Sequence, residues 1–213
     1  MATKLKLSPN EAAELIRTFK DRSDHLKERG RGFFVNERYM DAIRAYQQGF
    51  TLCNNYFDAV NNDLPMKCDF AGAEEVKQDD NKMWLQEFEK LKAIFCNNMA
   101  ACYQKMGDLE QADSYNNWAL KECPDYAKAL HRKCMILEDK GEYTQAVKVS
   151  EWCSLRFGHE DEPEDNQQTV PHFRDLAQRC KERIPYEVNE KNEKLKKEAD
   201  DEFDAVFTQN EEI

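Results

Sequence analysis

Long apolar runs are missing from this chain of 213 residues. No segment approaches the roughly 18 consecutive apolar residues that a membrane-spanning helix requires, so the sequence predicts no membrane span. The first residues, Met1 to Leu7, contain neither a long apolar core nor a small-residue cleavage site. We therefore expect no secretory signal. Together the two absences favour a cytoplasmic protein.

Recognisable catalytic motifs are missing as well. The sequence has no glycine-rich phosphate loop and no nucleophile elbow. His131 and Cys134 are three residues apart on one expected helix, but no carboxylate at a suitable spacing could orient the imidazole. A cysteine hydrolase or a metal-dependent enzyme is therefore disfavoured. The sequence predicts a protein that is not an enzyme, with no catalytic residue and no cofactor.

Cysteine is frequent, with eight residues, but the spacings that bind zinc are missing. No Cys-x-x-Cys pair occurs, and none of the four histidines pairs with a cysteine at zinc-site spacing. Cys134 and Cys153 instead occupy small-residue positions of the repeat described below, where a free cysteine acts as a compact hydrophobe. We therefore expect no metal site, and a reducing, cytosolic setting.

The chain also has no excess of positive charge, since its formal net charge is −11 at pH 7. Binding to nucleic acid requires a basic surface, so the composition argues against a nucleic acid partner. An acidic protein can still hold a local basic groove. The positions of the cations along the chain therefore matter more than their total.

What the sequence does contain is an internal repeat. The stretches Ala93 to Pro124 and Ala127 to Gly158 align at an interval of 34 residues. Small residues recur at the eighth, twentieth and twenty-seventh positions, and a glycine recurs at the turn between them. The matched pairs are Ala100 with Cys134, Gly107 with Gly141, Ala112 with Ala146, and Ala119 with Cys153. This period is typical of the tetratricopeptide repeat, a helix-turn-helix unit that usually forms binding surfaces.

A third copy begins upstream at Ser23, with Gly30 at the eighth position and Phe33 at the eleventh. It starts 70 residues before the second copy, so an insertion is expected between the two. We predict an all-α fold, a right-handed superhelix of three tetratricopeptide repeats. The expected parts are an N-terminal helical extension (1–22), repeats at about 23–56, 93–126 and 127–160, an insertion at about 57–83, an acidic linker (159–170), and a capping helix with a charged tail (171–213).

The ends of this array have their own signals. Ser8, Pro9 and Glu11 form a helix start, from which a leading helix should run into the first repeat. Phe173, Leu176, Cys180 and Ile184 form an apolar stripe that can cover the open face of the last repeat. Pro185 is then expected to kink or end that helix.

Cations and amides gather on one face of the first helices of the repeats. Positions two, five, six and nine of those helices share a stripe, because steps of three and four residues stay on one helix face. The stripe holds Lys27 and Arg31 in the first repeat, Asn97 and Asn98 in the second, and Lys128, His131 and Arg132 in the third. Clustered cations favour an anion, and a carboxylate would accept charge-assisted hydrogen bonds from them.

Five of these residues resemble the dicarboxylate clamp of the tetratricopeptide domains of Hsp70/Hsp90 co-chaperones. In that family Lys and Asn of the first repeat, Asn of the second, and Lys and Arg of the third hold the free C-terminus of a chaperone that ends in Glu-Glu-Val-Asp. Lys27, Asn98, Lys128 and Arg132 match this pattern. Arg31 stands where the family has Asn, and it either replaces the amide donor or changes the preferred last residue of the ligand.

The resemblance extends from about Ser23 to Arg183. The long insertion is similar to that of the large immunophilins, and the charged end is similar to small clamp proteins of the tetratricopeptide repeat protein 1 type. It implies a cytosolic co-chaperone or adaptor that binds the acidic tail of Hsp90 or Hsp70, and a client protein through the insertion or the C-terminal helix. The alternative is a scaffold in a multi-subunit assembly that uses the insertion and the C-terminal helix as its binding surfaces, with an incidental basic groove and no binding of a chaperone tail.

Overall fold

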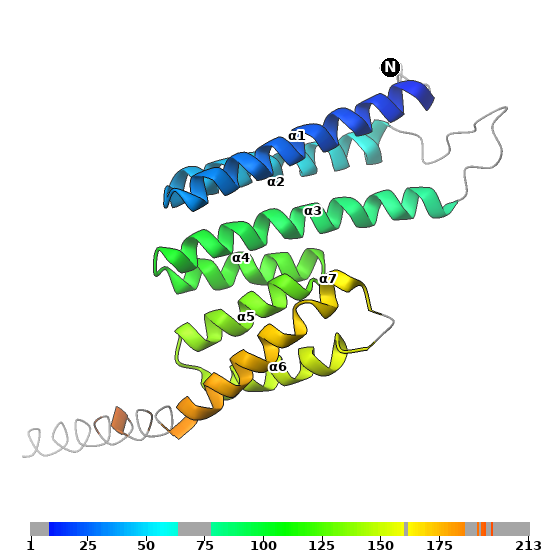
Figure 1. Ribbon diagram of the computed structural model, residues 1–213. Helices are drawn as coiled ribbons and strands as arrows, with labels where there is room; N and C mark the ends of the chain where they lie inside the picture. Colours follow the sequence, from blue (N-terminus) through cyan, green and yellow to red (C-terminus); the bar gives the residue numbers. More distant parts are fainter. Residues whose placement is uncertain are drawn as a thin grey trace, which may run out of the picture. The chain divides into compact units, whose positions relative to one another are not determined.

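Helices account for all the regular secondary structure that the computed structural model describes, which covers residues 9–63, 78–159 and 162–185 and residues 191, 193, 194 and 197 (Figure 1). The chain is all-α in this part, as predicted. None of the helices described is long and apolar enough to cross a membrane. The helices are α1 (Pro9–Val35), α2 (Tyr39–Asp63), α3 (Gln78–Lys105), α4 (Leu109–Glu122), α5 (Ala127–Asp139), α6 (Tyr143–Arg156), α7 (Glu164–Gln167), and a further helix over 170–185.

The helix boundaries follow the predicted repeat register. Tyr39, Leu109 and Tyr143 begin α2, α4 and α6, and each is the seventeenth residue of its repeat. The leading helix α1 runs without a break from Pro9 into the first repeat, as expected. Small residues of the repeat are completely buried, because two helices meet there; they are Ala42, Ala100, Ala112, Ala119, Cys134, Ala146 and Cys153.

Two glycines of the first repeat mark the closest helix contacts. A Cβ atom at Gly30 on α1 would overlap the ring of Tyr46 on α2. A Cβ atom at Gly49 on α2 would overlap the ring of Phe95 on α3. Gly49 is the twenty-seventh residue of its repeat, the position that Ala119 holds in the second. These glycines set the spacing of α1, α2 and α3.

The turns between paired helices use a left-handed residue. Gly107 and Gly141 have φ values of +80° and +76°, which glycine adopts without a steric penalty. In the first repeat the equivalent residue is Glu37, with φ of 59°. A side chain at a left-handed position costs about 1–2 kcal/mol. The first turn therefore carries strain that the other two lack.

Replacing the exposed Glu37 with glycine is expected to raise the free energy of unfolding by about 0.5–1 kcal/mol. The relief of strain exceeds the entropy that glycine adds to the unfolded chain. Denaturant unfolding at equilibrium measures the change. Gly107→Ala is the matched control and should destabilise, since its φ is also positive. Equal stability of Glu37→Gly and the parent would contradict the prediction.

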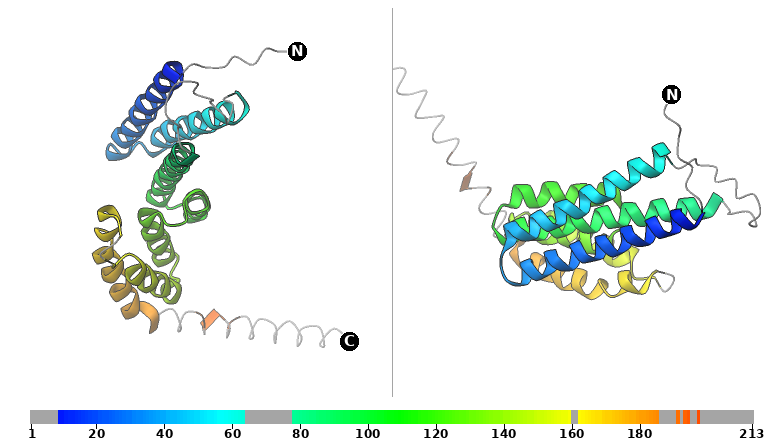
Figure 2. Two further views of the ribbon diagram at one scale, coloured as in Figure 1. Left: turned by 90° about the vertical axis from the view of Figure 1, so that its right-hand side faces the viewer. Right: turned by 90° about the horizontal axis from the view of Figure 1, so that it is seen from above.

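The chain divides into two compact units, Met1–Lys133 and Cys134–Ile213. In the first unit aromatic contacts join alternate helices, α1 with α3 and α2 with α4, and Figure 2 shows the α1–α2 hairpin beside α3. Phe19 on α1 meets Phe88 on α3 with ring centroids 4.8 Å apart, and Phe50 on α2 meets Trp118 on α4 at 4.7 Å. The buried Asn116 amide of α4 donates a 2.9 Å hydrogen bond to the Ala129 carbonyl of α5.

In the second unit the helix over 170–185 packs on α5 and α6. Phe173, Leu176 and Cys180 are completely buried, and the rings of Phe173 and Phe157 stack with centroids 6.1 Å apart. Arg179 pairs with Glu138 of α5 at 2.9 Å, and Lys181 pairs with Glu151 of α6 at 2.6 Å. The predicted apolar stripe is therefore the buried face of this helix.

Helices extend into two segments that the sequence assigned to connections. The ends of the insertion predicted at 57–83 are helical, since α2 continues to Asp63 and α3 begins at Gln78. The acidic linker predicted at 159–170 contains α7, and Glu162 accepts hydrogen bonds from Arg156 and Asn166. Residues 64–77, Ser8 and most of the predicted tail lie outside the described residues.

Candidate functional site

The five residues of the predicted clamp all lie in the first unit. Lys27 and Arg31 are on α1, Asn98 is on α3, and Lys128 and Arg132 are on α5. In the part of the chain that the structure describes, no hydrogen bond or ion pair connects any two of these five side chains. Those side chains that have partners pair with other residues, and the kind of partner differs between α1 and α5.

Arg132 is held by two neutral amides. Its Nε donates to Oδ1 of Asn97 at 3.0 Å, and its Nη1 donates to Oε1 of Gln104 at 3.0 Å. Partial burial lowers the pKa of the guanidinium, but arginine remains charged at any physiological pH. No carboxylate pairs with Arg132 among the described residues, and its Nη2 has no acceptor there. The site thus contains a fixed, uncompensated positive charge.

Two residues of α3 have a role that the sequence analysis did not assign. Asn97, placed there among the groove donors, is 4% exposed and uses its side-chain oxygen as an acceptor for Arg132. Toward Arg132, Asn97 therefore acts as an acceptor. Gln104 was not identified at all. The signal was present, since Gln104 follows Asn97 by seven residues, two helical turns that return to the same face. The sequence does not reveal the side-chain conformation with which Arg132 reaches both Asn97 and Gln104.

Lys128 and Asn98 present unengaged polar groups. Lys128 is exposed near the start of α5, and Asn98 is half-buried on α3. Among the described residues, neither side chain has a hydrogen-bond or ion-pair partner. Lys128 is four residues before Arg132, one turn away on the same helix face. The face of α5 therefore presents two cations whose charge no neighbouring carboxylate neutralises. His131, between them in sequence, is half-buried.

The cations of α1 differ because each pairs with a carboxylate three residues earlier on its own helix. Lys27 Nζ lies 2.7 Å from Asp24 Oδ1, and Arg31 Nη1 lies 3.4 Å from Glu28 Oε2. Arg31 is largely exposed, with 72% of its side chain accessible. Exposed pairs of this kind contribute about 0–1 kcal/mol and separate easily. The α1 half of the predicted clamp is locally neutral, whereas the α5 half is cationic.

The described part of the chain offers no cluster of metal-ligating side chains, and burial keeps several of its thiols protonated. No group of three or more His, Cys, Asp or Glu residues there could hold a metal ion. The seven described cysteines are all free thiols. Burial raises the pKa values of Cys53, Cys96 and Cys102 to about 12, so these thiols stay protonated and are poor nucleophiles.

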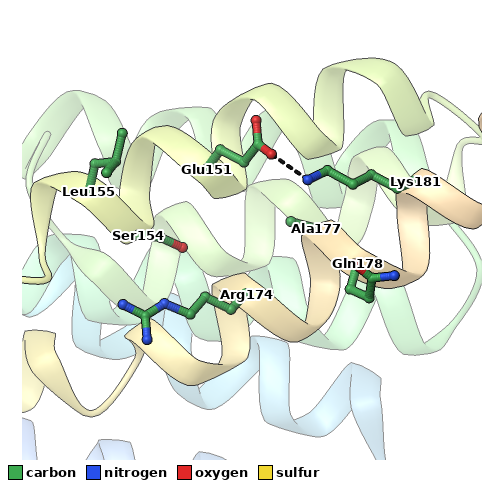
Figure 3. Close-up of a pocket in the computed structure, with 7 residues that line it drawn as sticks. All are labelled: Glu151, Ser154, Leu155, Arg174, Ala177, Gln178 and Lys181. Carbon is green, nitrogen blue, oxygen red and sulfur yellow. Dashed lines mark ion pairs between the residues drawn. The ribbon is translucent and has the colours of Figure 1, made fainter.

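A separate groove of about 460 Å³ lies in the second unit, between α6 and the helix over 170–185 (Figure 3). The Glu151–Lys181 ion pair spans one end and Arg174 lies at the other. Leu155 at its edge is 75% exposed. The residues that line it are Glu151, Ser154, Leu155, Arg174, Ala177, Gln178 and Lys181, and none belongs to the predicted clamp.

Part of the chain is similar in sequence to a known yeast protein. The mitochondrial import receptor subunit TOM70 of Saccharomyces cerevisiae, in strains YJM789 and S288c, is 28% identical over 122 residues, which cover 57% of this chain and 14% of the relative. The chain has a tetratricopeptide-repeat-like fold. No protein-family model matches it.

Two solved structures show partial similarity. The Sgt2 TPR domain from Aspergillus fumigatus superposes with a TM-score of 0.49 at 18% identity, covering 89% of this chain and 88% of that one. MamA protein superposes with a TM-score of 0.29 at 13% identity, covering 83% and 96%. The fold assignment rests on the helix register and the buried small residues described above.

Proposed function

We propose that this chain is a cytoplasmic, non-enzymatic adaptor that binds the acidic C-terminal peptide of an Hsp90- or Hsp70-type chaperone. The observation that supports this most directly is Arg132, a partly buried guanidinium held by two amides and without a carboxylate partner among the residues that the structure describes. Placing a charge in a partly desolvated position is unfavourable unless an opposite charge arrives. The matching sequence relative is an import receptor subunit, which favours a protein-binding role over a catalytic one.

In this proposal the two halves of the site bind different groups of the peptide. Arg132 and Lys128 on α5 hold the last acidic side chain of the peptide. Lys27 and Arg31 on α1, with Asn98 on α3, hold the terminal carboxylate, and they must first release Asp24 and Glu28. The contacts are few and partly solvated, so the affinity should be about micromolar, or about −8 kcal/mol. It should also weaken as salt is added.

The test is calorimetric titration with a ten-residue peptide that ends in Glu-Glu-Val-Asp, as the free acid and as the C-terminal amide. The acid should bind, and the double substitution Lys128→Ala with Arg132→Ala should weaken binding by at least about 30-fold, since two charge-assisted contacts are lost. Lys121→Ala with Lys148→Ala removes the same charge from exposed positions on α4 and α6 and should have little effect.

Failure of both peptide forms to bind a demonstrably folded protein would reject the proposal. The scaffold interpretation, in which other surfaces carry the function, would then lead. Binding of the acid that the double substitution leaves unchanged would also reject the assigned residues, because the ligand would lie elsewhere on the chain.

A further inference from the structure

The two side chains that accept hydrogen bonds from Arg132, Asn97 and Gln104, are both neutral amides. We infer that Asn97 and Gln104 are positioning residues that keep the Arg132 guanidinium oriented and uncompensated, so that the site selects a full carboxylate over an amide at the position it contacts. The inference deepens the proposed function and rests on it. Arg132 would contact an acidic side chain of the ligand, and the amides of α3 would leave its charge available for that contact.

The geometry supports this selection. Two hydrogen bonds of 3.0 Å, from Nε and Nη1, fix the plane of the guanidinium from two directions. Both acceptors come from α3, at residues 97 and 104, while the arginine comes from α5. A guanidinium fixed in this way loses less freedom when a ligand binds, and pre-organisation of this kind increases affinity. The two N–H groups of Nη2 remain to donate to the ligand.

The chemical nature of the acceptors matters as much as their position. An aspartate or glutamate at 97 or 104 would hold the arginine equally well or better, since a charge-assisted hydrogen bond is the stronger kind. It would also neutralise the charge. Carboxylates do accompany other cations of this unit, since Lys133 pairs with Asp113 and Lys92 pairs with Glu122. Amides around Arg132 hold it and leave its charge for an incoming anion.

The discriminating change is Gln104→Glu, which keeps an oxygen acceptor and adds a competing charge. Two peptides are compared by calorimetry: one ends in Glu-Glu-Val-Asp, and the other ends in Glu-Glu-Val-Asn with its terminal carboxylate intact. The parent protein should prefer the first by about tenfold, equivalent to one acidic contact of about 1.4 kcal/mol. In Gln104→Glu that preference should fall to about twofold or less, without loss of thermal stability.

A purely structural role for Gln104 would leave the ratio of the two affinities unchanged, and that result would overturn the inference while the proposed function stands. Asn97→Asp gives an independent reading on the other acceptor if Gln104→Glu does not fold. Gln48→Glu, at an exposed position of α2, is the matched control for net charge and should keep the parent's preference. Failure of the parent protein to bind either peptide would instead reject the proposed function, and the inference with it.

Discussion

Replacing Phe95 with alanine is expected to lower the free energy of unfolding by about 3–5 kcal/mol. Phe95 is completely buried on α3, 6.4 Å from the ring of Tyr46 on α2, centroid to centroid. Removing the ring leaves a cavity where α2 and α3 approach, and the backbone of Gly49 offers no side chain to fill it. Urea unfolding monitored by circular dichroism measures the loss.

A substitution at Gly49 tests the same contact from the side of α2. A Cβ at Gly49 would overlap the Phe95 ring, so Gly49→Ala alone should cost about 1–3 kcal/mol by overpacking. In the Phe95→Leu background the same methyl group meets a smaller side chain, so its cost should fall to about 1 kcal/mol or less. A double-mutant cycle isolates this coupling.

Additive effects of Gly49→Ala and Phe95→Leu would contradict the close contact. Gly32→Ala is the matched control, since a Cβ at this exposed position of α1 would meet no atom within 4 Å. It should be neutral or slightly stabilising, because alanine is favoured over glycine inside a helix. Comparable losses at Gly32 and Gly49 would mean that the glycines act through the helix backbone and not through packing.

The repeat positions could be predicted from the sequence because steric fit at the helix contacts leaves few residue types possible. Ala100, Ala112 and Cys134 were identified by their spacing and are completely buried. Gly49 follows the same rule at the twenty-seventh position. The end of α2 was not predicted, since Asn61, Asn62 and Asp63 are typical of loops yet continue the helix. Local propensity is a weak guide to where a helix ends.

The residue types of the candidate site could be predicted from the sequence, but the hydrogen bonds and ion pairs that these side chains form could not. The spacing placed cations on one stripe of the first helices. Whether a cation is neutralised depends on the rest of the helix, and the acids three residues before Lys27 and Arg31 could have indicated it. The contact of Arg132 with Asn97 joins residues 35 positions apart. No local sequence pattern predicts this contact, because the contact depends on how α3 and α5 pack.

Breaking the Lys92–Glu122 ion pair is expected to cost about 3 kcal/mol or more. Lys92 Nζ on α3 lies 2.8 Å from Glu122 Oε2 on α4, and both side chains are only 16% exposed. Lys92→Met keeps much of the volume but leaves a mostly buried carboxylate without its cation, which is a severe penalty. Chemical denaturation compares this variant with the parent at pH 7.

The double variant Lys92→Met with Glu122→Gln separates the charge from the packing. Glutamine removes the uncompensated carboxylate and retains an oxygen for the Trp118 indole, which donates to Glu122 Oε1 at 3.2 Å. Stability should therefore recover by more than half of the loss. Lys181→Met, which breaks an ion pair whose side chains are about half exposed, should cost less than about 1 kcal/mol. A loss at Lys92 as small as that at Lys181 would mean that water reaches Glu122, and that α3 and α4 are held by their apolar contacts alone.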